Sequence, residues 1–195
     1  MSHRDRREEL LRRDFLLVAS FAALGPWLPW LPRIRAAVPT EPRATDDVTI
    51  VQFSDAGVRQ GPANVPKVVK SGAEWRSQLS ALAFEITRRA GTERPFSGAY
   101  WNLHEKGIFR CVCCDTALFN SAVKFDSGTG WPSFWQPIAK ENVVGPKKVS
   151  PTGDETEVTC RRCDAHLGDL FDDGPRPTVL RYCIDSVSMR FVRTS

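Results

Sequence analysis

The sequence predicts a mainly β domain of the α+β class, with a few helices on its N-terminal side. From residue 92 onward, short runs of β-branched and aromatic residues alternate with Gly, Pro, Asn and Asp, which is typical of antiparallel β-structure. Helical signals are confined to residues 71–90. Two Cys-x-x-Cys pairs, Cys111 with Cys114 and Cys160 with Cys163, are typical of a pair of zinc knuckles.

Residues 1–37 have the composition of an export signal rather than of a folded domain. A twin-arginine pair, Arg12-Arg13, follows a basic start, and an apolar stretch runs from Phe15 to Leu31. Ala36-Ala37 supplies small residues for cleavage. A membrane anchor is the alternative, but prolines interrupt the apolar stretch, which is short for a span of about 20 residues. We expect a cleaved signal, passage through the twin-arginine export machinery and a periplasmic location.

The net charge weighs against nucleic acid as a partner. The chain carries +4, from 27 Lys and Arg against 23 Asp and Glu, but residues 1–37 hold seven arginines and four acidic residues. The remainder has 20 basic and 19 acidic residues, a charge of +1, and lacks the basic excess that binds phosphate backbones. At roughly 155 residues it is long enough for one domain with its own core, and we expect a monomer.

Residues 38–70 are predicted to form a linker and an N-terminal extension, and residues 71–195 the folded domain. The stretch 39–47 is polar and contains prolines. Residues 48–53 alternate and are rich in β-branched side chains, which favours one short strand.

Two helices and five further strands are predicted in the folded domain. The first helix begins after Ser71, because Ser71 and Glu74 have the spacing of a capping box, and it runs to about Leu79. The second spans Ala81 to Ala90 and is ended by Gly91. The strands are predicted from β-rich runs bounded by turn residues, at 107–112, 116–119, 157–160, 179–185 and 188–192.

The spacing of the six cysteines divides them into groups with different chemistry. Four thiolates in two close pairs suit a closed tetrahedral Zn²⁺ site, with Zn–S distances of about 2.3 Å. Three disulfides are the alternative in an exported protein. Asp115-Thr116 and Asp164-Ala165, which follow the two pairs, suit a knuckle turn. Cys183 lies apart, as a reactive thiol or as an inert core thiol. This distribution favours a redox or acyl-transfer enzyme held together by structural zinc.

Four segments of the domain carry motifs beyond the cysteine pairs. They are GTERPFSG at 91–98, FDSGTGWPSF at 125–134, CRRCDAHLG at 160–168, and DGPRP at 173–177 leading to RYC at 181–183. In this order and spacing they resemble the methionine sulfoxide reductase B family, and the resemblance covers about residues 71–192.

The resemblance implies two antiparallel β-sheets with a few peripheral helices. It implies an enzyme that reduces the R epimer of methionine sulfoxide in oxidised proteins and peptides, a repair reaction after oxidative stress. It also implies structural zinc on Cys111, Cys114, Cys160 and Cys163, remote from the chemistry, with Cys113 as a bystander.

The resemblance also assigns the reacting groups. Cys183 matches the family nucleophile, which attacks the sulfoxide sulfur and ends as a sulfenic acid. Arg181 would share its strand face and favour the thiolate. His166 matches a histidine beside the substrate oxygen. Trp131 matches an aromatic residue that packs on the substrate methyl group, and we add Phe134 to the substrate-binding residues. A surface ion pair is the alternative for Arg181, and a structural role for His166 and Trp131.

Two departures from the family pattern bring carboxylates near Cys183. Asp169 stands where most members have a second histidine, and Asp185 where most have asparagine. Like charge would raise the pKa of Cys183 and reduce its thiolate fraction. Alternatively, one aspartic acid stays protonated and supplies the proton to the leaving oxygen. Both residues are therefore catalytic candidates, and the sequence leaves these two effects open.

A third departure concerns the regeneration of the enzyme. Thr129 occupies the position of a resolving cysteine in many members. A sulfenic acid on Cys183 then has no obvious intramolecular partner, because Cys113 adjoins a zinc ligand. We therefore expect a thioredoxin-like or other dithiol reductant to reset the nucleophile.

Two other functions remain as alternatives. Asp169 and Asp185 favour a non-catalytic relative that binds oxidised methionine, whereas the intact Cys183 and its neighbours argue against it. A zinc-ribbon interaction module would explain the two Cys-x-x-Cys pairs but none of the other motifs.

Overall fold

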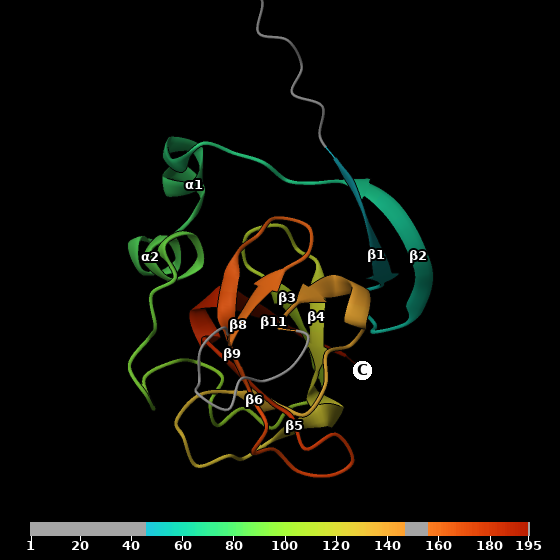
Figure 1. The fold of residues 1–195 in the computed structure, drawn as a ribbon, viewed down its shortest axis with the longest axis vertical. Helices are drawn as coiled ribbons and strands as arrows, with labels where there is room; N and C mark the ends of the chain where they lie inside the picture. Colours follow the sequence, from blue (N-terminus) through green and yellow to red (C-terminus); the bar gives the residue numbers. More distant parts are fainter. Residues whose placement is uncertain (1–45, 147–155, 195) are drawn as a thin grey trace, which may run out of the picture. The chain divides into compact units, whose positions relative to one another are not determined.

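The computed structural model describes residues 46–146 and 156–194. In this part of the chain the fold is mainly β with two short helices (Figure 1), which confirms the predicted fold class. The strands form antiparallel sheets of two, six and three strands. Neither helix in these ranges is long and apolar enough to cross a membrane. The predicted export signal in residues 1–37 lies outside the described residues.

The two larger sheets pair strands that are distant in the sequence. In spatial order, the six-stranded sheet consists of β5 (Lys124–Phe125), β6 (Ser133–Phe134), β10 (Arg181–Ile184), β9 (His166–Phe171), β8 (Glu157–Cys160) and β7 (Val143–Val144). The three-stranded sheet consists of β11 (Met189–Arg193), β3 (Gly107–Cys111) and β4 (Ala117–Asn120). The 3-10 turns are η1 (Ser121–Val123), η2 (Lys140–Asn142) and η3 (Ser186–Ser188).

All five strands predicted after residue 92 are present, with ends that differ by at most two residues. The sequence did not predict β9, because Gly168 and Asp169 have low strand propensity. Pairing with β8 on one side and β10 on the other imposes the extended conformation. The strand that carries His166 is therefore a product of tertiary pairing.

Both predicted helices form close to their predicted bounds. Helix α1 (Gly72–Gln78) begins with the expected capping box, in which the Ser71 hydroxyl accepts from the Glu74 amide and the Glu74 carboxylate accepts from the Ser71 amide at 2.7 Å. Helix α2 (Ala81–Arg89) ends at Ala90, which has a left-handed backbone with φ of 52°. Gly91 was expected to end this helix, and the left-handed position falls one residue earlier.

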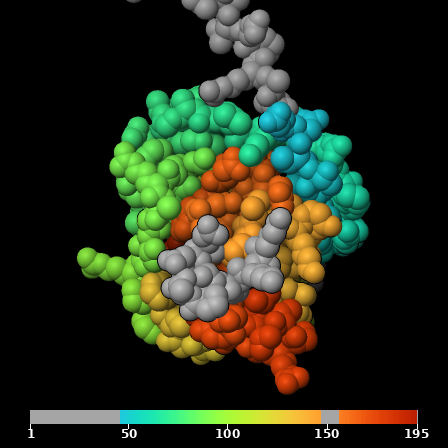
Figure 2. Space-filling model, viewed as in Figure 1, coloured from blue at the N-terminus to red at the C-terminus, as the bar shows by residue number. Residues whose placement is uncertain are grey.

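The segment expected as a linker and extension folds onto the domain. Strands β1 (Asp47–Phe53) and β2 (Arg59–Pro66) form a hairpin, of which only the first strand was predicted. Strand β2 contains Gly61 and two prolines, which are rare inside strands, but an exposed edge strand tolerates proline. Asn142 ties the hairpin to the body, because its side-chain amide bonds the Val51 N–H at 2.7 Å and C=O at 2.8 Å. Figure 2 shows the hairpin lying against the body of the molecule.

An aromatic core lies between the two larger sheets. Phe109 and Phe119 extend from the three-stranded sheet and Phe134 from the six-stranded sheet. The rings of Phe119 and Phe134 are stacked with centroids 4.4 Å apart, and those of Phe109 and Phe134 meet edge-on at 5.1 Å. Each of these side chains is fully buried, so the core fixes how β6 and its neighbour β10 lie.

Candidate active site and metal centre

Two turns of the same form present the paired cysteines. In the first, the Cys111 amide donates to the Thr116 carbonyl and the Asp115 amide donates to the Cys111 carbonyl. In the second, Cys160 bonds Ala165 and Asp164 in the same way. Asp115 and Asp164 both have positive φ, a conformation that aspartate adopts more readily than most residues. The predicted knuckle turns are confirmed.

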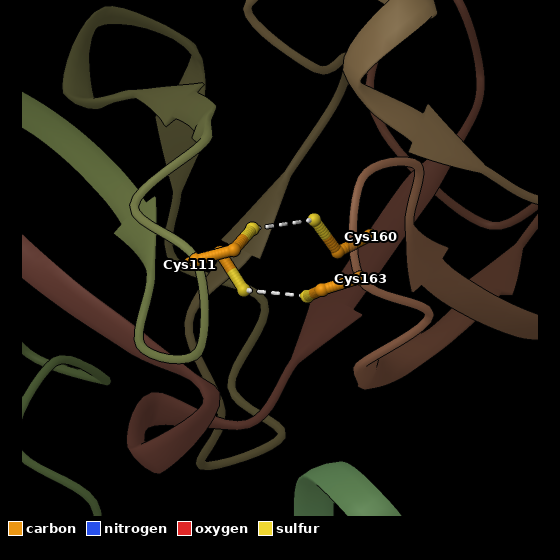
Figure 3. Close-up of side chains that lie close together, drawn as sticks. Cys111, Cys160 and Cys163 are labelled. Carbon is orange, nitrogen blue, oxygen red and sulfur yellow. Dashed lines mark hydrogen bonds between the residues drawn. The ribbon is translucent and has the colours of Figure 1, made fainter. Parts of the chain in front are cut away.

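The two knuckles bring their sulfur atoms into one cluster. Cys111 lies at the end of β3 and Cys160 at the end of β8, so the cluster joins the two larger sheets (Figure 3). The Sγ atoms of Cys111 and Cys163 lie 3.7 Å apart, and those of Cys114 and Cys160 lie 3.5 Å apart. All four sulfurs lie within 4.8 Å of one another, and all six cysteines are free thiols.

This geometry fits a bound metal ion. A metal with four thiolates at about 2.3 Å in a tetrahedron holds the sulfurs about 3.8 Å apart, which is close to the spacing found. Disulfide sulfurs lie about 2.05 Å apart, so the disulfide alternative is wrong for this structure. Cys113 is 4% exposed and its sulfur lies 3.4 Å from the Thr87 hydroxyl of α2; it adjoins the four-cysteine cluster without belonging to it.

Cys183 lies in the middle of the six-stranded sheet. On β10 it is paired with Asp169 of β9 on one side and with Ser133 of β6 on the other. Gly168 permits this close approach, because a Cβ at that position would lie 2.1 Å from the Cys183 carbonyl oxygen. Cys183 is half-buried, so the residue is not enclosed in the core.

Arg181 lies on the same face of β10 as Cys183, as expected. Its guanidinium donates twice to the Asp173 carboxylate, at 2.7 and 2.8 Å, and lies over the ring of Phe171. The ion pair raises the pKa of Arg181 and lowers that of Asp173. The ion pair offered as the alternative for Arg181 is therefore present, and it holds the guanidinium charge beside the Cys183 thiol.

Opposing effects act on the Cys183 thiol. Burial raises its pKa above the ordinary value. The Arg181 charge lowers it, as does a hydrogen bond from Thr129, and the carboxylates of Asp185 and Asp169 raise it again. The two aspartates noted in the sequence therefore do face the nucleophile.

His166 lies between two carboxylates. Its Nδ1 atom is 2.8 Å from a Glu157 oxygen, and its Nε2 atom is 3.9 Å from Asp185 Oδ2. Asp185 is only 2% exposed, and this burial raises its pKa to about 6. From the sequence, His166 and Asp185 were expected near the thiol. In the structure the side chains of Asp185, His166 and exposed Glu157 follow one another in a row.

Glu93 is a site residue that sequence reasoning did not single out, although it lies in the first family motif. Its amide donates to Asp185 at 2.9 Å and its carbonyl accepts from the Trp131 indole at 3.1 Å. Its buried carboxylate accepts from the amides of Ser186 and Val187. Glu93 therefore positions the acid Asp185 and the half-buried ring of Trp131 with one backbone segment.

The assignment of Phe134 to substrate binding is wrong. Its side chain is 0% exposed and packs between the rings of Phe109 and Phe119. Side chains alternate between the faces of a strand, and Phe134 follows Ser133, the direct partner of Cys183. It therefore points into the core instead of toward the thiol.

Comparison with known proteins places the chain in a family. Residues 79–193 match the SelR domain. A peptide methionine sulfoxide reductase MsrB of Hahella chejuensis is 52% identical over 125 residues, which cover 64% of this chain and 90% of the relative. MsrB of Herminiimonas arsenicoxydans is 53% identical over 66% of this chain and 93% of the relative. MsrB of Thioalkalivibrio sulfidiphilus is 55% identical over 60% and 85%.

The matched region contains the knuckle cysteines, His166 and Cys183, the residues on which the sequence motifs and the site geometry converge. The chain therefore belongs to the SelR-domain family, that of the B-type peptide methionine sulfoxide reductases.

Proposed function

We propose that this protein reduces methionine-R-sulfoxide in peptides and proteins to methionine, with Cys183 as the nucleophile. The observation that carries the proposal is the placement of the partly exposed Cys183 near both the Arg181 cation and Asp185, which itself lies beside His166. The relatives named as peptide methionine sulfoxide reductases support the same chemistry.

The reaction follows from these groups. The Cys183 thiolate attacks the electrophilic sulfoxide sulfur, and the S–O bond breaks as the oxygen takes up protons and leaves as water. Water then cleaves the S–S bond to the substrate, which releases methionine and leaves Cys183 as a sulfenic acid. In sum, the thiol is oxidised and the sulfoxide is reduced. The protons come from Asp185 and His166, and His166 contacts exposed Glu157. Trp131 packs on the substrate methyl group.

The experiment that tests this function is a single turnover with the pre-reduced protein and no added reductant. A peptide carrying methionine-R-sulfoxide should yield about one methionine per chain, as expected for a single nucleophile. The same peptide with the S epimer should remain unreacted, because one enzyme serves each epimer. Absence of methionine from folded, metal-loaded protein with the R epimer would refute the proposal.

We also propose that a dithiol protein resets Cys183. Thr129 lowers the pKa of the Cys183 thiol and therefore lies beside it, so no thiol stands where an intramolecular disulfide would form. A dithiol reduces the sulfenic acid to the thiol and becomes a disulfide, with release of water.

Thr129→Cys is expected to change the product of one turnover. The introduced thiol would lie in contact with Cys183 and condense with the sulfenic acid, because sulfenic acids react readily with a nearby thiol. Peptide mass mapping under non-reducing conditions should show a disulfide between position 129 and Cys183. The wild-type protein should instead give a dimedone adduct on Cys183. A variant that still accumulates the sulfenic acid would contradict the proposed role of position 129.

Asp185→Asn is expected to lower the pKa of Cys183. The Asp185 charge raises the thiol pKa, and this charge is present only above the Asp185 pKa of about 6. Above pH 6 the variant thiol should therefore react with iodoacetamide roughly threefold faster or more. Below pH 6 the two rates should converge, because Asp185 is then protonated.

Mass mapping restricts this measurement to Cys183, and Asp172→Asn, at an exposed position on the loop after β9, is the matched control. Alkylation profiles that coincide across the whole pH range would show that Asp185 does not act on the thiol.

We propose zinc as the metal of the cysteine cluster, since four thiolates in a closed site are its usual structural ligands. Bound zinc would cross-link the two larger sheets at Cys111 and Cys160. We further propose that a twin-arginine signal exports the chain to the periplasm. This route carries folded proteins, so the cluster could acquire its metal before an oxidising compartment reaches the thiols.

A further inference from the structure

Phe96 is an exposed aromatic residue in a strained backbone position beside the candidate active site. It occupies the third position of the turn Arg94–Ser97, which the Ser97 amide closes on the Arg94 carbonyl at 3.3 Å. Its φ is +62°. Turns with proline in the second position, here Pro95, favour glycine or asparagine at a third position with positive φ. A bulky residue there is an outlier whose cause lies outside the turn itself.

Two hydrogen bonds fix this segment to the wall of the active site. The Phe96 amide donates to the Gly130 carbonyl at 2.8 Å, and the Trp131 indole donates to the Glu93 carbonyl at 3.1 Å. Gly130 follows Thr129, whose hydroxyl bonds the Cys183 thiol. Segment 93–96 therefore runs beside segment 130–131, which carries the Trp131 ring that we assign to the substrate methyl group.

The Phe96 ring rests directly on the backbone of Gly130. A Cβ at Gly130, which has φ of +91°, would lie 2.7 Å from the Phe96 amide nitrogen and 2.8 Å from its ring. Phe96 and Gly130, which both have positive φ, are therefore packed directly against each other. The other edge of the ring meets Trp101, with centroids 5.3 Å apart and planes at 82°.

The ring is nonetheless 55% exposed. An aromatic ring held rigidly at two sides and open on a third forms a ready contact surface for an apolar group. This surface adjoins Gly130, the neighbour of Trp131, and a peptide whose methionine sulfoxide lies at Trp131 continues in extended form by about 3.3 Å per residue.

We propose that Phe96 and Trp101 form a subsite for an apolar side chain adjacent to the oxidised methionine in an unfolded polypeptide. The inference rests on the proposed function, and it deepens that function by naming the preferred substrate class. Methionines that are flanked by apolar residues are buried in native proteins, so this subsite directs the enzyme to unfolded or damaged chains.

The experiment compares kcat/KM for two R-sulfoxide peptides that differ only at the flanking residues, Leu in one and Ser in the other, with free N-acetylmethionine sulfoxide as a third substrate. The wild-type protein should prefer the Leu peptide. Phe96→Ala should reduce kcat/KM for the Leu peptide by roughly tenfold, because it removes one apolar contact surface. The Ser peptide and the free sulfoxide should change by less than about twofold.

Leu82→Ala is the matched control, because Leu82 has the same exposed fraction of 55% and lies on α2. It should change none of the three values. Phe96→Tyr retains the aromatic face and should keep the wild-type preference for the Leu peptide. Thermal melting of each variant separates loss of the subsite from loss of the fold.

The outcomes distinguish the two proposals. If the wild-type protein reduces all three substrates without preference, or if Phe96→Ala slows all of them equally, the subsite is refuted while the reductase function stands. If the wild-type protein reduces none of them, the proposed function fails and the subsite fails with it.

Discussion

Cys183→Ser is expected to abolish reduction of methionine sulfoxide. In the single-turnover assay with the R epimer, the amount of methionine formed per unit time should fall by at least about a thousandfold. A serine hydroxyl is not ionised near neutral pH, so it lacks the thiolate that attacks the sulfoxide sulfur. The expected loss is large because no other described thiol lies beside both Arg181 and Asp185.

The control for this experiment is Cys113→Ser, which also removes one thiol. Cys113 is buried beside α2 and should be dispensable for the turnover. A dimedone adduct should appear on Cys183 in the wild-type protein and in this control. Methionine formation by Cys183→Ser at the wild-type rate would exclude Cys183 as the nucleophile and would assign the attack on the sulfoxide to another group of the protein.

Loss of the metal is expected to unfold the domain or to destabilise it severely. Structural zinc contributes about 10 to 16 kcal/mol in zinc-finger peptides, whereas a whole domain is stable by only about 5 to 15 kcal/mol. Here the cluster joins β3 of one sheet to β8 of the other, and Cys160 within it is fully buried. Cys160→Ser, or treatment of the wild-type protein with a strong chelator, should therefore remove the cooperative thermal transition or lower its midpoint greatly.

Elemental analysis and thermal melting of the same samples check this expectation. The wild-type protein should hold one zinc per chain, and Cys160→Ser should hold far less. Cys113→Ser should retain the full amount, because Cys113 adjoins the cluster but does not belong to it. A Cys160→Ser protein that kept its zinc and its melting temperature would rule out the four-cysteine site. A different metal at full occupancy would overturn only the choice of zinc.

Local sequence signals predicted the local structure well. The capping box at Ser71 and Glu74 forms as expected, and both knuckle turns form after the cysteine pairs. These features depend on residues within a few positions of one another, so spacing alone specifies them. The same holds for Arg181 and Cys183, which lie two residues apart on one strand and must share a face.

Features that depend on distant partners were missed or misplaced. β2 and β9 contain proline, glycine or aspartate, and both are strands because a neighbour pairs with them. Phe134 lies in a family motif, but its neighbours across the sheets bury it in the core. Nothing local to Glu93 indicates that its backbone would position both Asp185 and Trp131.

By itself, the sequence determined the chemistry available to this protein: four thiols in two knuckles, one separate thiol, a histidine and two unusual aspartates. Only the tertiary structure decided how these groups act on one another. It buried Asp185, and the loss of solvation raises the pKa of that acid to about 6, although the Glu93 amide and His166 act in the opposite direction. It also laid the exposed Phe96 ring on Gly130 beside the site. The physical reason is that burial and charge proximity depend on contacts between segments tens of residues apart, which spacing along one chain does not encode.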